Sequence, residues 1–457
     1  MYQKPKSFFI QTYGCQHNVL DSEVMTGSLI RYGLEKSKTL EEADLIVFNT
    51  CSVRHTAENK AIGRLVSLAK GKRPGTIIGV SGCVANHRKE LLLSSLPHVD
   101  FVMGTNNMHA LTDILDELLT KGERVIRVDD VFEHELEYML AERSDQISAY
   151  VSIIRGCNKF CTYCIVPYTR GPEVSRPWQN IIQECEELAR KGYKEITLLG
   201  ENVNGYGKDC QEEGVLFHDL LEKLHAIPRI ERIRFITSHP IDISDALIEA
   251  VGRLPKVCEF VHFCLQAGSN RILKKMHRMY TRESYREKVE KLRKVLSEKH
   301  ELLRKTIHPE LFADWGIGTD IIVGFPSETE DEFLETYRAM EEDDFTMAFL
   351  FMYSPRKGTP STRFLDDVSK ENKLDRLHRL LDLHERTVTR QRRQAIGHVV
   401  EVLIDGMSSK DDGHVKGRTR GWWKAIAPGG EELLGTTQLM RVHDVKHSTL
   451  VGEILAS

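Results

Sequence analysis

Short apolar runs alternate with amphipathic segments along the first part of the chain. Runs with the composition of buried strands lie at residues 8–13, 43–50, 76–81 and 99–105, and the helical period of apolar positions occurs at 21–33 and 55–71. Apolar strands that alternate with amphipathic helices are typical of a parallel sheet in an α/β layer fold. The sequence therefore predicts an α/β domain with a parallel sheet over residues 1–128.

A second series of strand and helix patterns follows an acidic stretch. Residues 129–146 lack a strand pattern, and we interpret them as a linker. Within residues 147–380, strand candidates then lie at 149–156, 195–202, 232–239, 260–267, 318–325 and 345–354. Six successive strand–helix units predict an open, partial TIM-like barrel of the (β/α)6 type, because a closed TIM barrel needs eight. Residues 300–315 overfill one connection and are interpreted as an insertion.

The C-terminal part, residues 381–457, joins the end of a basic helix to a β-rich module. One long and increasingly basic helical pattern covers residues 369–395, and from residue 396 onward short β runs are separated by glycine turns. These features predict a small β-barrel of about five strands.

Composition and charge narrow the class of protein. A chain of 457 residues with 41% hydrophobic and 28% charged residues is expected to be globular and to form several domains. The net charge of -4 means that any nucleic-acid binding depends on local basic patches. No apolar run approaches the roughly 20 residues of a membrane helix, and no secretion signal is predicted. Ten cysteines then indicate a reducing, cytoplasmic location, where clustered cysteines bind metal or act in catalysis.

Three cysteines lie close together after the first strand of the predicted partial barrel. Cys157, Cys161 and Cys164 form a C-x3-C-x2-C motif. Cysteine thiolates normally hold a [4Fe–4S] cluster through four ligands, so a trio would leave one iron open to exogenous chemistry. The spacing alone also permits a zinc site completed by a distant residue, or three buried thiols. The position at the end of a barrel strand, where such folds place active sites, favours the cluster.

With the aromatic Tyr163 before the last cysteine, this motif resembles that of the radical S-adenosylmethionine (SAM) superfamily. The resemblance implies that the open iron binds the amino and carboxylate groups of SAM, and that one electron splits the sulfonium. The segment "TDIIVGFPSETEDEF" resembles the glycine-containing strand that lies near the adenine of SAM in that superfamily. The cofactor-binding residues predicted at strand ends, for which turn or cap roles stay open, are Tyr163, Gly200, Glu201, Ser238, Gln266 and Gly324.

A second set of three cysteines is spread over the N-terminal domain. Cys15, Cys51 and Cys83 each follow directly after a predicted strand. The carboxyl ends of parallel strands meet at one edge of a sheet, so these residues can converge. One such cysteine is ordinarily a small buried hydrophobe, but the repeated placement predicts a second three-thiol site. The other four cysteines are interpreted as structural or incidental: Cys185, Cys210, Cys258 and Cys264.

Two three-cysteine sites, an α/β domain, a partial barrel and a C-terminal β module together resemble the methylthiotransferase family over nearly the whole chain. The C-terminal module resembles the RNA-binding TRAM domain of that family. The segments "TYGCQHN", "NTCSVRHTAENK", "LQAGSNRILKKMHRMYT" and "FLFMYSPRKGTPSTRF" are most similar to the branch that modifies tRNA. That branch converts N6-isopentenyladenosine at position 37, next to the anticodon, to its 2-methylthio derivative.

The resemblance implies a set of cofactors and partners. Two [4Fe–4S] clusters are expected, one that cleaves SAM and one auxiliary sulfur donor, with two SAM used per product. The implied partners are the anticodon stem-loop of tRNA, an electron donor such as a flavodoxin or ferredoxin, and a cluster-repair carrier, without a membrane. Branches that modify threonylcarbamoyladenosine or a ribosomal-protein aspartate stay as alternatives. A non-catalytic, zinc-containing RNA-binding protein is an alternative of another class.

Some residues depart from the family pattern, and others suggest how RNA is held. His17 stands where the family more often has methionine, and Glu201 stands where glutamine is commoner. Arginine and lysine can neutralise phosphates, and exposed aromatics such as Trp422 and Trp423 can stack on loop bases. A solvated helix face and two core tryptophans are the alternative. The predicted RNA-binding residues are Arg386, Arg390, Arg392, Arg393, Lys416, Arg418 and Arg420.

Overall fold

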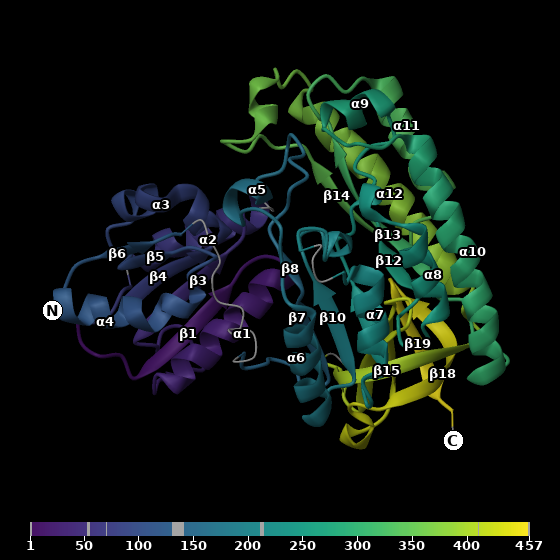
Figure 1. Cartoon of the computed structure of the whole chain (residues 1–457), viewed down its shortest axis with the longest axis horizontal. Helices are drawn as coiled ribbons and strands as arrows, with labels where there is room; N and C mark the ends of the chain where they lie inside the picture. The colour runs from purple at the N-terminus through teal and green to yellow at the C-terminus, as the bar shows by residue number, and fades with distance from the viewer. Residues whose placement is uncertain are drawn as a thin grey trace.

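The computed structural model describes residues 2–52, 55–69, 71–129, 141–210, 214–409 and 411–455 (Figure 1). Most of the predicted linker at 129–146 therefore lies outside the described residues. Among the helices that are described, none combines the length and the apolar character needed to cross a membrane.

The N-terminal domain is a parallel sheet of six strands in the order β2-β1-β3-β4-β5-β6. The strands are β1 (Ser7–Thr12), β2 (Glu35–Lys36), β3 (Leu45–Thr50), β4 (Ile77–Gly82), β5 (Phe101–Met103) and β6 (Val125–Arg127). The helices are α1 (Gln16–Arg31), α2 (His55–Leu68), α3 (Cys83–Ser95) and α4 (Leu111–Lys121). All four predicted strands are confirmed. The edge strands β2 and β6 were not predicted, because two or three residues are too few to show an apolar run.

The central domain is the predicted partial barrel. Two parallel three-stranded sheets, β11-β10-β7 and β12-β13-β14, are joined by the bridges Ile233–Val257 and Ser238–Phe263. The strands are β7 (Ser148–Ser152), β10 (Glu195–Leu199), β11 (Arg232–Phe235), β12 (Phe260–His262), β13 (Gly316–Val323) and β14 (Met347–Met352). The helices are α5 (Val166–Thr169), α6 (Trp178–Arg190), α7 (Phe217–His225), α8 (Asp245–Arg253), α9 (Asn270–Lys275), α10 (Arg282–Thr306), α11 (Glu330–Glu342) and α12 (Lys370–Arg393). The short strands β8 (Ile154–Arg155) and β9 (Val174–Ser175) pair antiparallel beside the barrel.

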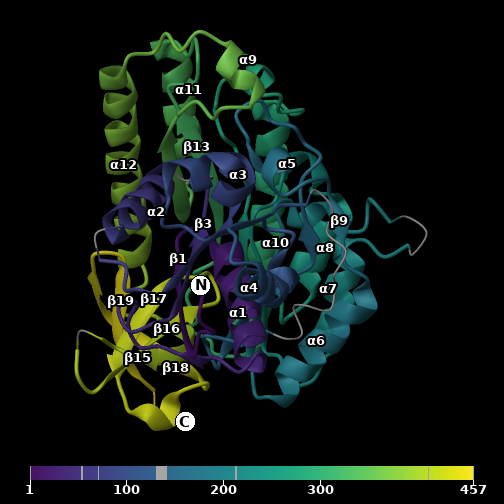
Figure 2. The ribbon, with the colours of Figure 1, turned by 90° about the vertical axis from the view of Figure 1, so that its left-hand side faces the viewer.

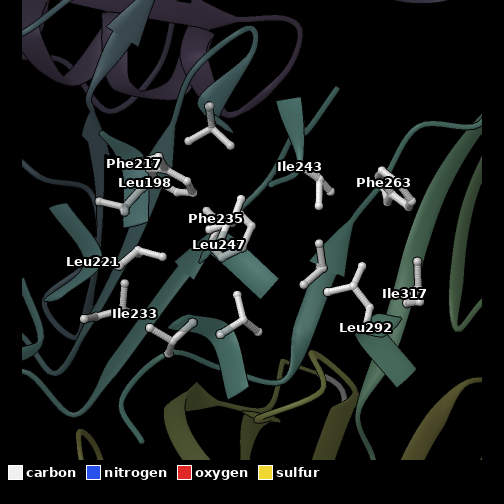
Figure 3. Packing of buried hydrophobic residues seen from close by; sticks show 14 of the residues in the cluster. Leu198, Phe217, Leu221, Ile233, Phe235, Ile243, Leu247, Phe263, Leu292 and Ile317 are labelled. Carbon is white, nitrogen blue, oxygen red and sulfur yellow. The ribbon is translucent and has the colours of Figure 1, made fainter. Parts of the chain in front are cut away.

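The core of the partial barrel lies between the strands and the surrounding helices (Figure 3). Phe235 on β11 meets Phe217 on α7 edge to face, with ring centroids 5.1 Å apart. Such aromatic pairs contribute beyond the apolar area that they bury. This packing fixes the strands relative to the helices, so that their carboxyl ends can position a site.

The C-terminal module is a closed five-stranded barrel in the order β15-β16-β17-β19-β18, as predicted. Its strands are β15 (Val399–Met407), β16 (His414–Thr419), β17 (Lys424–Pro428), β18 (Thr437–Lys446) and β19 (Thr449–Ile454). Trp423 is 3% exposed and belongs to its core. The helix α12, with Ser369 as its N-cap, leads into this barrel along the outside of the central domain (Figure 1).

The C-terminal barrel packs against the amino ends of the central strands. Arg232, the first residue of β11, donates through Nη1 to the carbonyl oxygen of Arg418 at 2.7 Å. Arg234 donates through Nη2 to the carbonyl oxygen of Thr419 at 2.8 Å. Figure 1 shows the C-terminal barrel at the opposite end of the strands from α5. The C-terminal barrel therefore does not cover the carboxyl ends of the strands.

Residues 300–315, which the sequence analysis interprets as an insertion, pack against other parts of the chain. Residues as far as Thr306 extend α10. Beyond it, Phe312 donates its backbone N–H to Val399 of β15 at 2.7 Å, and its ring lies 5.9 Å from that of Trp423. The segment joins the two barrels, and its apolar residues face a partner that lies far away in the sequence.

The N-terminal and central domains are also tied together. Beyond the undescribed part of the linker, Arg143 lies between the domains, 3.2 Å from Glu23 of α1 and 2.5 Å from Glu184 of α6. Thr105 accepts a hydrogen bond on its backbone oxygen from Arg155 at 2.8 Å. Viewed from the side of the N-terminal domain, β1 and β3 lie in front of the central barrel (Figure 2).

Candidate metal and cofactor centre

The N-terminal cysteines lie at the carboxyl ends of three neighbouring strands. Cys15 is the N-cap of α1 after β1, Cys51 follows β3, and Cys83 begins α3 after β4. The thiols of Cys15 and Cys51 are hydrogen-bonded, and Cys15 also interacts electrostatically with Cys83. Gly14 permits this approach, because a Cβ on it would lie 2.6 Å from the Cβ of Cys51. The topology thus brings together three residues that are far apart in sequence.

The electrostatics of this trio suit metal ligation. The hydrogen bond from Cys51 lowers the pKa of Cys15 to about 5, against the opposing effect of burial. Burial raises the pKa of Cys83, while Arg170 opposes that effect. Iron–sulfur clusters bind thiolates, and the lowered pKa of the half-buried Cys15 favours that form.

The second trio lies in the loop between β8 and α5. The loop is held by backbone hydrogen bonds, from Cys157 N–H to Gly171 O at 3.1 Å and from Thr162 N–H to Met276 O at 3.0 Å. Burial raises the pKa of Cys157 to about 12, and Cys161 and Cys164 influence each other electrostatically. The loop presents these thiols at the open end of the partial barrel.

A single zinc ion requires closely spaced thiols. A tetrahedral zinc with bonds of about 2.3 Å places its sulfur ligands about 4 Å apart. Within the described part of the chain, the one group of three ligand atoms that all lie within 4.8 Å of one another is His262, Cys264 and Asp320. Neither cysteine trio forms such a group in the described residues.

Two of the predicted SAM residues carry buried polar atoms that lack a partner in the described structure. These atoms are Ser238 Oγ and Gln266 Oε1. Gln266 also has φ of +71°, a strained conformation for a non-glycine residue. Buried orphan atoms and backbone strain are typical of a site that binds a ligand. Both residues therefore fit a polar cofactor at the carboxyl ends of the strands.

The other predicted SAM residues have clear local roles. Gly200 has no room for a side chain, since a Cβ would lie 2.4 Å from Ile154 Cγ2. Gly324 directly follows β13, has φ of +68° and donates its N–H to Glu328 at 2.6 Å. Tyr163 packs against an apolar cluster beside the loop.

Glu201 lies between the two trios. Its Oε2 accepts a hydrogen bond from Gly156 N–H at 3.0 Å. Its Oε1 lies 3.5 Å from Arg170 Nε and 3.8 Å from His17 Nδ1. The two departures from the family pattern, His17 and Glu201, therefore meet in space and connect the N-terminal domain to the central barrel.

The structure divides the predicted RNA-binding residues into two groups. Arg392 and Arg420 are each 7% exposed. Arg392 lies 4.9 Å above the ring of Trp423, and burial lowers its pKa to about 10. Arg420 pairs with Glu259 at the contact between the barrels. The prediction that these two face RNA is therefore wrong, while the exposed or half-exposed residues are Arg386, Arg390, Arg393, Lys416 and Arg418.

One polar group was missed at the sequence level. Cys264 Sγ lies 3.1 Å from Asp320 Oδ2, and His262 Nε2 lies 3.4 Å from Asp320 Oδ1. Cys264 was interpreted as incidental, although the period of two along a strand places His262 and Cys264 on one face. The pairing with β13 supplies Asp320, which no local pattern reveals.

Comparison with known proteins first defines the class. Family models match the uncharacterized protein family UPF0004 over residues 7–104 and the radical SAM superfamily over residues 151–340. The radical S-adenosylmethionine methyltransferase TsrM from Kitasatospora setae, solved with cobalamin and a [4Fe–4S] cluster bound, has a similar fold. Its TM-score is 0.52 at 14% identity, over 78% of this chain and 77% of that chain. The match over the partial barrel and the thiol loop it carries define a radical SAM protein.

Full-length relatives then define the family. The tRNA-2-methylthio-N(6)-dimethylallyladenosine synthase of Protochlamydia amoebophila is 55% identical over 98% of this chain and 96% of its own. The enzyme with the same name from Thermoanaerobacter pseudethanolicus is 44% identical over 98% of this chain and 92% of its own. The chain belongs to this family of radical SAM methylthiotransferases, which confirms the family predicted from the cysteine pattern.

Proposed function

We propose that the enzyme converts N6-isopentenyladenosine of tRNA, at position 37 next to the anticodon, to its 2-methylthio derivative. The observation that carries the proposal is the presence of two thiol trios on separate domains of one chain that is 55% identical to a relative named for this reaction. Carbon 2 of adenine bears an unactivated C–H bond, which radical chemistry can break. A sulfur source close to the radical site would then complete the reaction.

Each trio would hold one [4Fe–4S] cluster, and the ligands we propose are Cys15, Cys51 and Cys83 for the auxiliary cluster, and Cys157, Cys161 and Cys164 for the other. When bound, the clusters supply the electron that cleaves SAM and the sulfur that is transferred. Ser238 and Gln266 would bind polar groups of SAM, since their buried oxygen atoms have no partner among the described residues.

The residues around the site would orient the cofactors and exclude water. Backbone hydrogen bonds clamp the thiol loop, and the C-terminal barrel covers the amino ends of the strands, so the substrate base would enter from the carboxyl end. A base of an anticodon loop can be splayed out at low cost, because it is not held in a duplex. We assign residues 1–128, 147–380 and 381–457 to the auxiliary site, to SAM cleavage and to RNA binding.

RNA would be held by the exposed basic residues. Lys416 and the half-exposed Arg418 lie on β16, while Arg386, Arg390 and Arg393 line a groove between α11 and α12. Arg390 pairs with Asp344, and Glu385 also lines the groove, so the surface is of mixed charge. On RNA binding, an arginine such as Arg390 would therefore leave its carboxylate partner and pair with a phosphate instead.

Further partners follow from the chemistry. A flavodoxin or ferredoxin would deliver electrons to the SAM-cleaving cluster, and a cluster-repair carrier would restore the auxiliary cluster after it loses sulfur. We place the reaction in the cytoplasm, where tRNA is found and thiols stay reduced.

The proposal is tested with reconstituted protein, SAM, a reductant and tRNA that carries N6-isopentenyladenosine. The triple variant of Cys15, Cys51 and Cys83 to alanine should still produce 5′-deoxyadenosine but no methylthio nucleoside by mass spectrometry. Cys185→Ala, a buried thiol in α6, is the matched control and should keep full product formation. Full product from the triple variant would refute the sulfur-donor role.

The choice of substrate needs its own measurement. Nucleosides and ribosomal proteins from cells that lack the enzyme should have lost only the 2-methylthio derivative of N6-isopentenyladenosine. If a methylthiolated threonylcarbamoyladenosine or ribosomal aspartate were lost instead, the enzyme would act on one of the alternative substrates.

A further inference from the structure

Each thiol trio has a buried arginine of its own. Arg278 donates through Nη1 to Cys161 Sγ at 3.2 Å. Arg170 forms a hydrogen bond with Cys83 and acts electrostatically on Cys15. The two arginines are 7% and 5% exposed. Because a guanidinium keeps its proton in proteins, each trio has a permanent positive charge beside its sulfur atoms.

Arg170 is supplied by the opposite domain. It directly follows α5, in the same segment of the central barrel that bears the second trio. Its side chain crosses to the N-terminal domain, where Nη2 donates to Asp21 of α1 at 2.9 Å, and its Nε lies 3.5 Å from Glu201. Contacts between α3 and α5 hold the two segments together. The N-terminal trio thus obtains this charge only while the two domains are docked.

Arg278 stays within the central barrel. It follows α9, donates through Nη2 to the carbonyl oxygen of Cys264 at 3.1 Å, and donates through Nε to Tyr280 at 2.8 Å. Arg278 interacts electrostatically with Cys161 and Cys164, whereas Arg170 interacts electrostatically with Cys15 and Cys83. The two arginines are therefore divided between the trios.

We propose that Arg170 and Arg278 are separate positioning residues, each of which sets the reduction potential of the cluster held by its own trio. The inference rests on the proposed function, in which both trios hold clusters. Hydrogen bonds to cluster sulfurs and the local net charge set the potentials of iron–sulfur clusters. A fixed cation stabilises the reduced form, so its loss moves the potential to more negative values.

This division has a functional consequence. The SAM-cleaving cluster must accept an electron, whereas the auxiliary cluster must give up sulfur. Because each cluster has its own arginine, the reduction potential of one cluster can be set independently of the potential of the other. Because Arg170 comes from the central barrel, the auxiliary cluster acquires its working potential when it lies against the domain that carries out the radical chemistry.

The test uses the full chain in two backgrounds that each keep one cluster. Alanine at Cys157, Cys161 and Cys164 leaves the N-terminal cluster, and alanine at Cys15, Cys51 and Cys83 leaves the central one. Redox titrations monitored by electron paramagnetic resonance then give each midpoint potential. Arg170→Gln should lower the potential only in the first background, and Arg278→Gln only in the second.

Further variants separate charge from folding. Arg170→Gln leaves the buried Asp21 unpaired, and Asp21 also acts electrostatically on Cys83. The double variant Arg170→Gln/Asp21→Asn restores the local net charge, so its shift should be smaller than that of Arg170→Gln. Arg170→Lys and Arg278→Lys keep the charge and should restore most of the potential. An unchanged potential in Arg170→Gln or Arg278→Gln that binds its cluster, or a change of equal size in both backgrounds, overturns the inference.

Failure of the proposed function gives a different result. If the unaltered chain binds no iron at one trio after anaerobic reconstitution, the assignment of clusters is wrong. If it binds both clusters and the arginine variants leave both potentials unchanged, only the role of the arginines is wrong.

Discussion

Replacing Arg420 by methionine removes a buried cation from the contact between the C-terminal barrel and the central barrel. Arg420 Nη2 lies 2.8 Å from Glu259 Oε1, and Glu259 is 2% exposed. Burial alone would raise the pKa of Glu259, but Arg420 and Lys299 hold it at about 2, against an ordinary value of 4.5. The carboxylate therefore stabilises the folded state at neutral pH through these two partners.

The expected magnitude follows from the lowered pKa of Glu259. A change from 4.5 to about 2 corresponds to about 3 kcal/mol, since a tenfold change in an acid constant is worth about 1.4 kcal/mol. Lys299 stays 2.9 Å from Glu259, so part of this stabilisation survives in the variant. We expect Arg420→Met to reduce the free energy of unfolding by about 2–3 kcal/mol at pH 7, a loss typical of a broken buried pair.

The pH dependence supplies a second check. Because the folded-state pKa is depressed, the stabilisation is present above about 4.5 and is lost as the pH falls toward 2. The difference in stability between the unaltered protein and Arg420→Met should therefore shrink as the pH falls from about 5 to about 3.

Urea unfolding of the metal-free chain, followed by tryptophan fluorescence, measures these quantities, because Trp422 and Trp423 lie at the contact. Arg441→Met is the matched control, since Arg441 makes an exposed pair with Glu310 at 2.6 Å and its loss should be much smaller. Equal unfolding midpoints for Arg420→Met and Arg441→Met at pH 7, or a loss that is as large at pH 3, would refute the reasoning.

Three further predictions concern the site and the RNA surface. Gly14→Ala should lower the iron content of the N-terminal trio roughly by half or more, measured by iron and sulfide analysis in the background that keeps only that trio, because the added Cβ would lie 2.6 Å from Cys51; normal iron would contradict the close approach. Gln266→Ala should weaken SAM binding on the order of tenfold in calorimetry, since it removes one buried polar partner; unchanged affinity would remove Gln266 from the site. Lys416→Glu combined with Arg418→Glu should weaken tRNA binding and reduce its salt dependence in filter-binding assays, whereas an unchanged salt slope would exclude β16 from the interface.

The sequence determined the architecture because its signals are local. Apolar alternation is visible within each strand, and the helical period is visible within each helix, so the parallel sheet, six barrel strands and a five-stranded barrel could all be predicted. The cysteines were also readable, because Cys15, Cys51 and Cys83 each follow a strand, and parallel strands end at one edge.

Tertiary structure decided which charged residues serve which purpose. Arg392 and Arg420 look like Arg386 in the sequence, yet two are buried and one is exposed, because burial depends on which domain packs above them. Residues 300–315 looked like an insertion because their partner, the start of β15, lies nearly a hundred positions away, as the pairing of Leu311 with Val399 shows.

The contacts between domains could not be predicted from the sequence either, because their partners also lie far apart in the chain. His17 and Glu201 each depart from the family pattern alone, and only the packing of α1 against the barrel places them 3.8 Å apart. Nothing in the local sequence around Arg170 and Arg278 reveals that each lies beside a cysteine trio. Local sequence specifies secondary structure through backbone and side-chain preferences, whereas the pairing of buried charges across domains is set by packing between residues far apart in the chain.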